Sequence, residues 1–137
     1  MRRIHLFCED AGHEQFLKAL LNRLARSYAI EIEIKVNSAR GGHGRMRHRL
    51  RNYIKRLREG WINAGTPDLI VVVRDANREG LSKRLSELKT DVKDYDSITI
   101  YAIPDPHLER WLLLDSSAFK DVLGRGCSAP DQKYEKD

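Results

Sequence analysis

The fold is decided by one run in the middle of the chain, Asp68-Leu69-Ile70-Val71-Val72-Val73. After Asp68 every residue is apolar and most are β-branched, and the turn residues Gly65-Thr66-Pro67 precede the run. A strand that is apolar on both faces is typical of the interior of a parallel sheet, where helices cover both sides. The run therefore predicts a central strand of an α/β domain.

Three more strands and four helices are predicted around this run. Apolar residues at helical spacing indicate the helices, and strict alternation from Ile30 to Val36 indicates a half-buried strand near a sheet edge. The pattern predicts an α/β three-layer sandwich with a mainly parallel four-stranded sheet. The predicted strands cover residues 4–8, 30–36, 68–73 and 97–103, and the helices cover 13–28, 45–59, 79–89 and a short segment after Pro106.

Each predicted element has an apolar face that should meet the core. In the second strand this face is Ile30, Ile32 and Ile34. The helical faces consist of Leu17, Leu20, Leu21, Leu24 and Tyr28 in the first helix, Met46, Leu50, Ile54, Leu57 and Trp61 in the second, and Leu81, Leu85 and Leu88 in the third.

The composition is that of one soluble domain. The chain has 137 residues, of which 41% are apolar and 33% charged, and this excludes collagen-like and wholly disordered chains. No apolar run approaches the roughly 20 residues of a transmembrane helix, and the stretch after Met1 is too short for a signal peptide. We expect a cytoplasmic protein without membrane contact. A domain over 1–123 is predicted, with a polar tail over 124–137 that is either a linker or a truncated continuation.

The cysteines, Cys8 and Cys127, form no CxxC pair, so a disulfide framework and a zinc ribbon are both disfavoured. Cys8 lies within an apolar strand and is interpreted as an inert buried thiol. His43 and His48 are five residues apart, which is the wrong spacing for a zinc site on one helical face.

Positive charge is concentrated in one segment. Residues 40–58 contain eight Lys or Arg and no acid, whereas the rest of the chain has 17 cations and 20 acids. This concentration predicts a polyanionic partner, with a solvated helix face as the alternative. The glycines of residues 41–44 lack the Lys-Ser/Thr that completes a P-loop. The candidate nucleic-acid-binding residues are Arg40, Arg45, Arg47, Arg49, Arg51, Lys55, Arg56 and Arg58.

Oxygen ligands follow three of the predicted strands, and ligands of open parallel sheets bind at this carboxyl edge. The residues are Glu9 and Asp10, Asp75 and Asn77, and Asp105 with Glu109. Converging carboxylates repel one another unless a hard cation such as Mg²⁺ joins them, and such an ion activates water toward a phosphodiester. The alternative for Asp10 or Asp75 is that each caps the following helix.

Three segments resemble the Toprim (topoisomerase–primase) superfamily, in its small stand-alone prokaryotic form. Phe7-Cys8-Glu9-Asp10-Ala11-Gly12 is similar to the first motif, and residues 68–77 resemble the second, a hydrophobic strand that ends in Asp-x-Asp. Residues 102–113, with Pro104-Asp105-Pro106 before Glu109-Arg110-Trp111-Leu112, are similar to a Toprim-like family in which a Glu-x-Trp-Leu helix follows a proline-rich turn. The resemblance extends from about residue 3 to residue 120.

The resemblance implies Mg²⁺ or Mn²⁺ and phosphodiester chemistry. By position, Glu9 matches the general acid/base and Asp75 the first metal-binding aspartate. Asn77 replaces the second aspartate, which removes one charge, and either Asp105 or Glu109 could supply it. The glycine expected directly after the glutamate is displaced to Gly12. Relatives of this size are often encoded with ATPases in phage-defence or mobile-element loci, so the resemblance implies an ATPase or other protein partner.

Three hypotheses follow. The chain is a metal-dependent nuclease, or a non-catalytic nucleic-acid-binding or adaptor module on a degenerate Toprim-like fold, or an interaction subunit whose basic helix meets an acidic protein. DNA and RNA are equally compatible with the sequence. Metal binding separates the first hypothesis from the others, and a steep salt dependence separates nucleic acid from most protein partners.

Overall fold

The computed structural model describes residues 1–38 and 44–113. The elements are β1 (Arg2–Cys8), α1 (Ala11–Ser27), β2 (Ile32–Ser38), α2 (Arg45–Arg58), β3 (Leu69–Val73), α3 (Leu81–Val92), β4 (Thr99–Ala102) and α4 (Leu108–Leu113), with 3₁₀ turns at Asn77–Glu79 and Lys93–Ile98. Arg40, the polar tail and the connection 39–43 lie outside the described residues.

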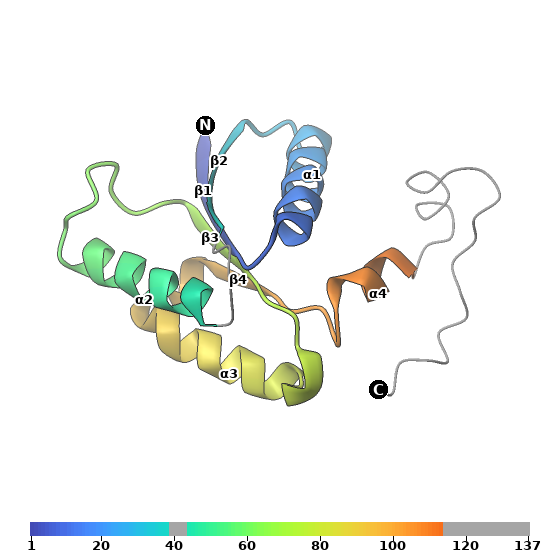
Figure 1. Cartoon of the computed structure of the whole chain (residues 1–137). Helices are drawn as coiled ribbons and strands as arrows, with labels where there is room; N and C mark the ends of the chain where they lie inside the picture. Colours follow the sequence, from blue (N-terminus) through green and yellow to red (C-terminus); the bar gives the residue numbers. More distant parts are fainter. Residues whose placement is uncertain (39–43, 114–137) are drawn as a thin grey trace.

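The four strands form one parallel sheet in the order β2-β1-β3-β4 (Figure 1). β3 lies between β1 and β4, and Ile70, Val71, Val72 and Val73 are almost completely buried, as the apolar run predicted. β2 is an edge strand that leaves its polar alternate residues in solvent. The predicted α/β class with a four-stranded parallel sheet is therefore confirmed.

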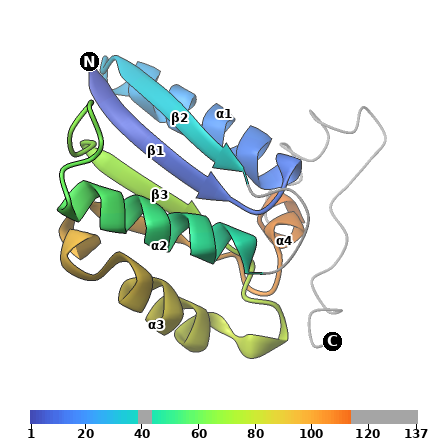
Figure 2. The same cartoon turned by 60° about the vertical axis from the view of Figure 1, so that its left-hand side comes forward.

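Helices cover both faces of this sheet. Helices α2 and α3 lie side by side on one face, and α1 lies on the other (Figure 2). The core beneath α2 and α3 contains Phe7, Leu50 and Leu88, and the core beneath α1 contains Leu6, Leu17 and Val73. The layers are thus helix, sheet and helix, as expected from alternating strands and helices.

Several residues of the predicted apolar faces are exposed instead. Leu20, Leu24 and Tyr28 of the first helix are 38%, 46% and 73% exposed. Helix α1 packs on β1 and β2, and Ile100 of β4 on the same face of the sheet is also exposed. The single helix α1 therefore covers only part of this face of the sheet. The apolar stripe of α1 is wider than the surface of the helix that contacts the sheet.

Three further predictions of burial were wrong for local reasons. Trp61 is 73% exposed because α2 ends in a Schellman motif, with Gly60 at φ +72° and a hydrogen bond from Trp61 N to the carbonyl of Arg56. Ile30 precedes β2 and lies in the turn after α1, where its N–H donates to the carbonyl of Ala25. Leu81 is exposed in the first turn of α3.

Candidate active site at the carboxyl edge of the sheet

The chain reverses its winding direction between β1 and β3. Helix α1 leads from β1 to β2 over one face of the sheet, whereas α2 and α3 lead to β3 and β4 over the other. The carboxyl ends of β1 and β3 therefore flank a topological switch point, which is where open α/β sheets bind ligands. Glu9 follows β1 and the pair Arg74-Asp75 follows β3 at this point.

Asp75 is held in place through one of its two carboxylate oxygens. Its Oδ1 accepts hydrogen bonds from His13 Nε2 at 3.0 Å and from the backbone N–H of Leu108 at 2.9 Å. Its Oδ2 lies 3.9 Å from His107 Nδ1, which is beyond hydrogen-bonding distance. Asp75 thus joins α1, β3 and the start of α4 through Oδ1, and Oδ2 accepts no hydrogen bond from the described residues.

His13 is buried and positioned by two acids. Its side chain is 2% exposed, and Nδ1 lies 3.6 Å from Asp10 Oδ2 without a hydrogen bond. Burial lowers the pKa of His13, but the hydrogen bond and charge of Asp75, together with the charges of Asp10 and Glu9, outweigh burial and raise the pKa. The imidazole is therefore biased toward its protonated form, and it orients Asp75.

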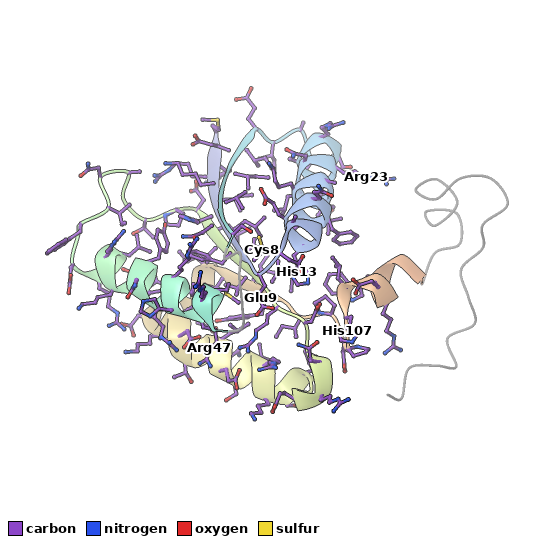
Figure 3. All side chains as sticks on the ribbon, in the orientation of Figure 1. Cys8, Glu9, His13, Arg23, Arg47 and His107 are labelled. Carbon is purple, nitrogen blue, oxygen red and sulfur yellow. The ribbon has the colours of Figure 1, made fainter. Side chains whose placement is uncertain are left out.

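Asp10 accepts a hydrogen bond from the backbone N–H of His13 at 2.8 Å and caps α1, as its alternative interpretation predicted. Asp75 also contacts a helix terminus, but this is the start of α4 and not of the helix that follows Asp75 in the chain. The side chains of Glu9, His13 and His107 are labelled in Figure 3, with Arg47 on the α2 side and Arg23 on the outer side of α1.

Glu9 is partnered by a buried arginine. Arg74 is 6% exposed, and its Nε lies 3.3 Å from Glu9 Oε1 while its Nη1 lies 3.0 Å from Glu87 Oε2. Burial and the neighbouring Arg84 lower the pKa of Arg74, yet a guanidinium stays charged in proteins. Arg74 therefore neutralises the acid that the resemblance assigns to proton transfer.

The network continues from Glu87 to α2. Glu87 also lies 3.3 Å from Arg84 and 3.7 Å from Arg47. Arg47 donates two hydrogen bonds to the buried Asp91, at 2.7 and 3.1 Å, and Arg51 lies 3.4 Å from the same carboxylate. This chain of ion pairs, which we call the arginine network, connects the carboxyl edge with the basic helix; its members are Glu9, Arg47, Arg51, Arg74, Arg84, Glu87 and Asp91.

The predicted basic residues divide into two groups. Arg47 and Arg51 belong to the arginine network, and Arg49 donates to the side chain of Asn37 and the carbonyl of Ser38. The cations of the other group are exposed on α2, and Arg58 among them lies 3.8 Å from Asp94; this group is Arg45, Lys55, Arg56 and Arg58. The helix thus uses part of its positive charge for packing and presents the rest to solvent.

The remaining predicted ligands are less closely held. Asn77 takes φ +53°, and its backbone N–H donates to the carbonyl of Pro106. The side chains of Asp105 and Glu109 are exposed. Within residues 1–38 and 44–113, no group of three His, Cys, Asp or Glu side chains is arranged to hold a metal ion. Glu9 and Asp75 thus follow neighbouring strands at this edge, and each has its own partner, Arg74 for Glu9 and His13 for Asp75.

Two carboxylates nevertheless fit the chemistry of Mg²⁺ or Mn²⁺. Mg²⁺ is commonly bound through one or two carboxylates plus substrate phosphates, and it retains several waters. The side chains of Glu9 and Asp75 are each 18% exposed and are hard oxygen donors. These two carboxylates fit an ion that is shared with a substrate phosphate. Arg74 would compete with this ion for the carboxylate of Glu9.

Sequence reasoning missed the residues that organise this edge, namely His13, Arg74, Arg84, Glu87 and His107. One signal was present for His13, which precedes Leu17 by one helical turn on the buried stripe of α1. Cys8, in contrast, is buried as predicted, and burial raises the pKa of its thiol to about 11.

Comparisons with known proteins found no relationship: no family model matches the chain, and no similar chain was found among curated proteins or solved structures. In the described part of the chain, no helix is long and apolar enough to span a bilayer.

Proposed function

We propose that this chain is a metal-dependent phosphodiesterase that cuts nucleic acid at the carboxyl edge of β1 and β3. The observation that carries the proposal is the geometry of Asp75 at the topological switch point: His13 and Leu108 orient the carboxylate through Oδ1, and Oδ2 accepts no hydrogen bond from the described residues. An oriented carboxylate with partners on one oxygen is typical of metal-ligating residues.

The proposed roles follow from the chemistry of each side chain. Asp75 and Glu9 would hold Mg²⁺ or Mn²⁺, and Asn77 would add a neutral oxygen. Such an ion, when bound, polarises a phosphodiester and lowers the pKa of a water. His13 keeps the carboxylate of Asp75 in one orientation. Arg74, which is buried between Glu9 and Glu87, holds the carboxylate of Glu9 in place through an ion pair at 3.3 Å.

The basic helix supports the choice of substrate. Helix α2 begins near the carboxyl end of β2, is joined to the edge through Arg47 and Glu87, and exposes several more cations. Arginine is suited to bidentate contact with phosphate, and seven of the eight cations in 40–58 are Arg. A role beside an ATPase in a phage-defence or mobile-element system is the corresponding proposal for the protein's context.

The test is cleavage of labelled single- and double-stranded DNA and RNA with Mg²⁺ or Mn²⁺, using the purified chain and Asp75→Asn. This variant keeps an oxygen for the N–H of Leu108, so the fold should persist, and thermal melting verifies it. The matched control is Asp94→Asn, because Asp94 is 86% exposed and pairs with Arg58 on α2. We expect metal-dependent cutting that falls by roughly 100-fold or more in Asp75→Asn and is unchanged in Asp94→Asn.

The second candidate is a non-catalytic nucleic-acid-binding module, and the ion pair between Arg74 and Glu9 favours it, since a guanidinium already neutralises one of the two carboxylates. Binding with a steep salt slope, but no cutting with either metal, would select this candidate and reject the nuclease. Equal cutting by Asp75→Asn would show that the assigned edge is not the site.

A further inference from the structure

A second feature of the basic helix lies away from the carboxyl edge. A cavity of about 400 Å³ opens between the C-terminal half of α2 and the end of α3. These two helices run side by side (Figure 2). The charged side chains that line the cavity are Arg51, Lys55, Arg58, Lys93, Glu59 and Asp91. We call this cavity the α2–α3 groove.

The charge of the groove is positive where solvent reaches it. Of its two acids, Asp91 has a side chain only 2% exposed and is already bound by Arg47 from the network side. Lys55 and Lys93 form no ion pair with any residue of the described ranges, and both are exposed. The other acid, Glu59, is exposed. Two free ammonium groups and two guanidiniums therefore outnumber one exposed carboxylate around a space that is large enough for a nucleotide-sized ligand.

The backbone at Lys93 contributes to this arrangement. Lys93 takes φ +50°, in the left-handed region, where the chain turns from α3 into the 3₁₀ turn at Lys93–Ile98. This turn places Lys93, the residue directly after α3, in the lining of the groove.

Helix α2 spans part of the separation between the groove and the carboxyl edge, since Arg47 connects to Glu9 only through Glu87 and Arg74. From Arg47, which contacts Glu87, to Lys55 is eight residues, or about 12 Å at 1.5 Å per residue. A stacked strand rises about 3.4 Å per nucleotide, so this span corresponds to three or four nucleotides. Cations along α2 bridge the interval.

We propose that the α2–α3 groove binds the backbone phosphates of the same nucleic-acid strand, at least three or four nucleotides away from the phosphate at the carboxyl edge. This inference rests on the proposed function and extends it, because it assigns a footprint to the substrate and adds Lys93 to the binding residues. Substrate length thus becomes a determinant of affinity. A strand shorter than the span reaches only one of the two sites.

The experiment measures binding in EDTA, so that it does not depend on cleavage. Fluorescence anisotropy of labelled single-stranded oligonucleotides of about 2 and 12 nucleotides is recorded over a range of salt concentrations. The test variant is Lys55→Glu with Lys93→Glu. The matched control is Arg23→Glu with Lys89→Glu, which changes the net charge equally at exposed positions outside the groove. Circular dichroism verifies that both double variants are folded.

We expect the groove variant to bind the longer oligonucleotide about tenfold more weakly or worse, with a salt slope smaller by about 1.4, since each single-strand phosphate contact contributes about 0.7. The short oligonucleotide should bind both variants alike. Equal weakening by both double variants would show that only the net charge matters, and the groove would be rejected as a binding site. If AMP displaces the labelled oligonucleotide as well as the unlabelled longer oligonucleotide does, the groove binds free nucleotides and the proposal of a bound strand is rejected. Loss of cutting in Asp75→Asn tests the proposed function separately.

Discussion

Replacing His13 with leucine should destabilise the fold most strongly at acidic pH. His13 is buried, its Nε2 lies 3.0 Å from Asp75 Oδ1, and Asp10 lies on the other side of the ring. Because the folded state raises the pKa of His13, the folded protein retains the proton to a higher pH than the unfolded chain does. This stabilisation is complete below the unfolded pKa of about 6.5 and is lost as the pH rises through the folded value.

The magnitude follows from the contacts. At about pH 5.5 the variant loses a hydrogen bond between an imidazolium and a carboxylate, which contributes about 1.5–3 kcal/mol. Above the folded pKa the variant loses only a hydrogen bond from a neutral imidazole, which contributes about 0.5–1.5 kcal/mol. The buried leucine side chain offsets part of this loss. The cost of His13→Leu should therefore fall by about 1–2 kcal/mol between acidic and alkaline pH. For a chain of this size each kcal/mol corresponds to roughly 3–5 °C in Tm.

Urea unfolding of both proteins, followed by circular dichroism near pH 5.5 and near pH 8.5, measures this change. His48→Leu is the control because His48 is exposed on α2 and its ring contacts only the side chain of Asn52 within the described residues. The reasoning would be refuted by a cost of His13→Leu that is the same at both pH values or that grows as the pH rises.

Three other substitutions test separate parts of the structure. His5 stacks on Phe7, and its burial, together with the charge of Lys35, lowers the pKa of His5 to about 4. The wild-type protein should therefore lose stability as the pH falls from about 6.5 toward 4, because the unfolded chain binds the proton first. His5→Phe should reduce this loss when Tm is measured over the same pH range. Asp91→Ala should cost about 3 kcal/mol in urea unfolding, because the half-buried Arg47 loses the buried carboxylate to which it donates two hydrogen bonds. A cost below about 1 kcal/mol would mean that the arginine network contributes little. Asn77→Asp should tighten Mn²⁺ binding about tenfold in calorimetry, because it adds a carboxylate to the proposed ligands. Asp tolerates the backbone conformation of this position, φ +53°. An unchanged affinity would remove Asn77 from the proposed ligands.

The sequence predicted those features that depend on local pattern. Val71 and Val73 belong to a run with no polar residue on either face, so a central strand was the only arrangement that buries them. The alternation of apolar and polar residues around Ile32 and Ile34 similarly predicted an edge strand with one solvent-exposed face. The carboxyl ends of neighbouring parallel strands share an edge, so the position of Glu9 and Asp75 at one edge of the sheet followed from topology alone.

The sequence could not predict which cations would accompany those acids. The contacts of Arg74 with Glu9 and of Arg47 with Asp91 join residues more than forty positions apart; the first depends on the pairing of β1 with β3 and the second on how α2 and α3 pack. The exposure of Leu24 has a comparable origin, because the pattern marks an apolar stripe but not the width of the surface that covers it. Trp61 was misjudged because the helical spacing continues past Gly60, where the backbone does not.

The position of β1 in the sheet has a consequence for how the protein folds. β1 is the first strand in the chain, yet it lies inside the sheet and pairs with residues 32–38 on one side and 69–72 on the other. During synthesis its second edge stays unpaired until β3 has emerged, and every ladder in this sheet joins segments far apart in sequence. We expect slow folding limited by the closure of these long connections. The apolar strand Ile4–Cys8 is the segment most exposed to aggregation or chaperone binding while it waits for its partner.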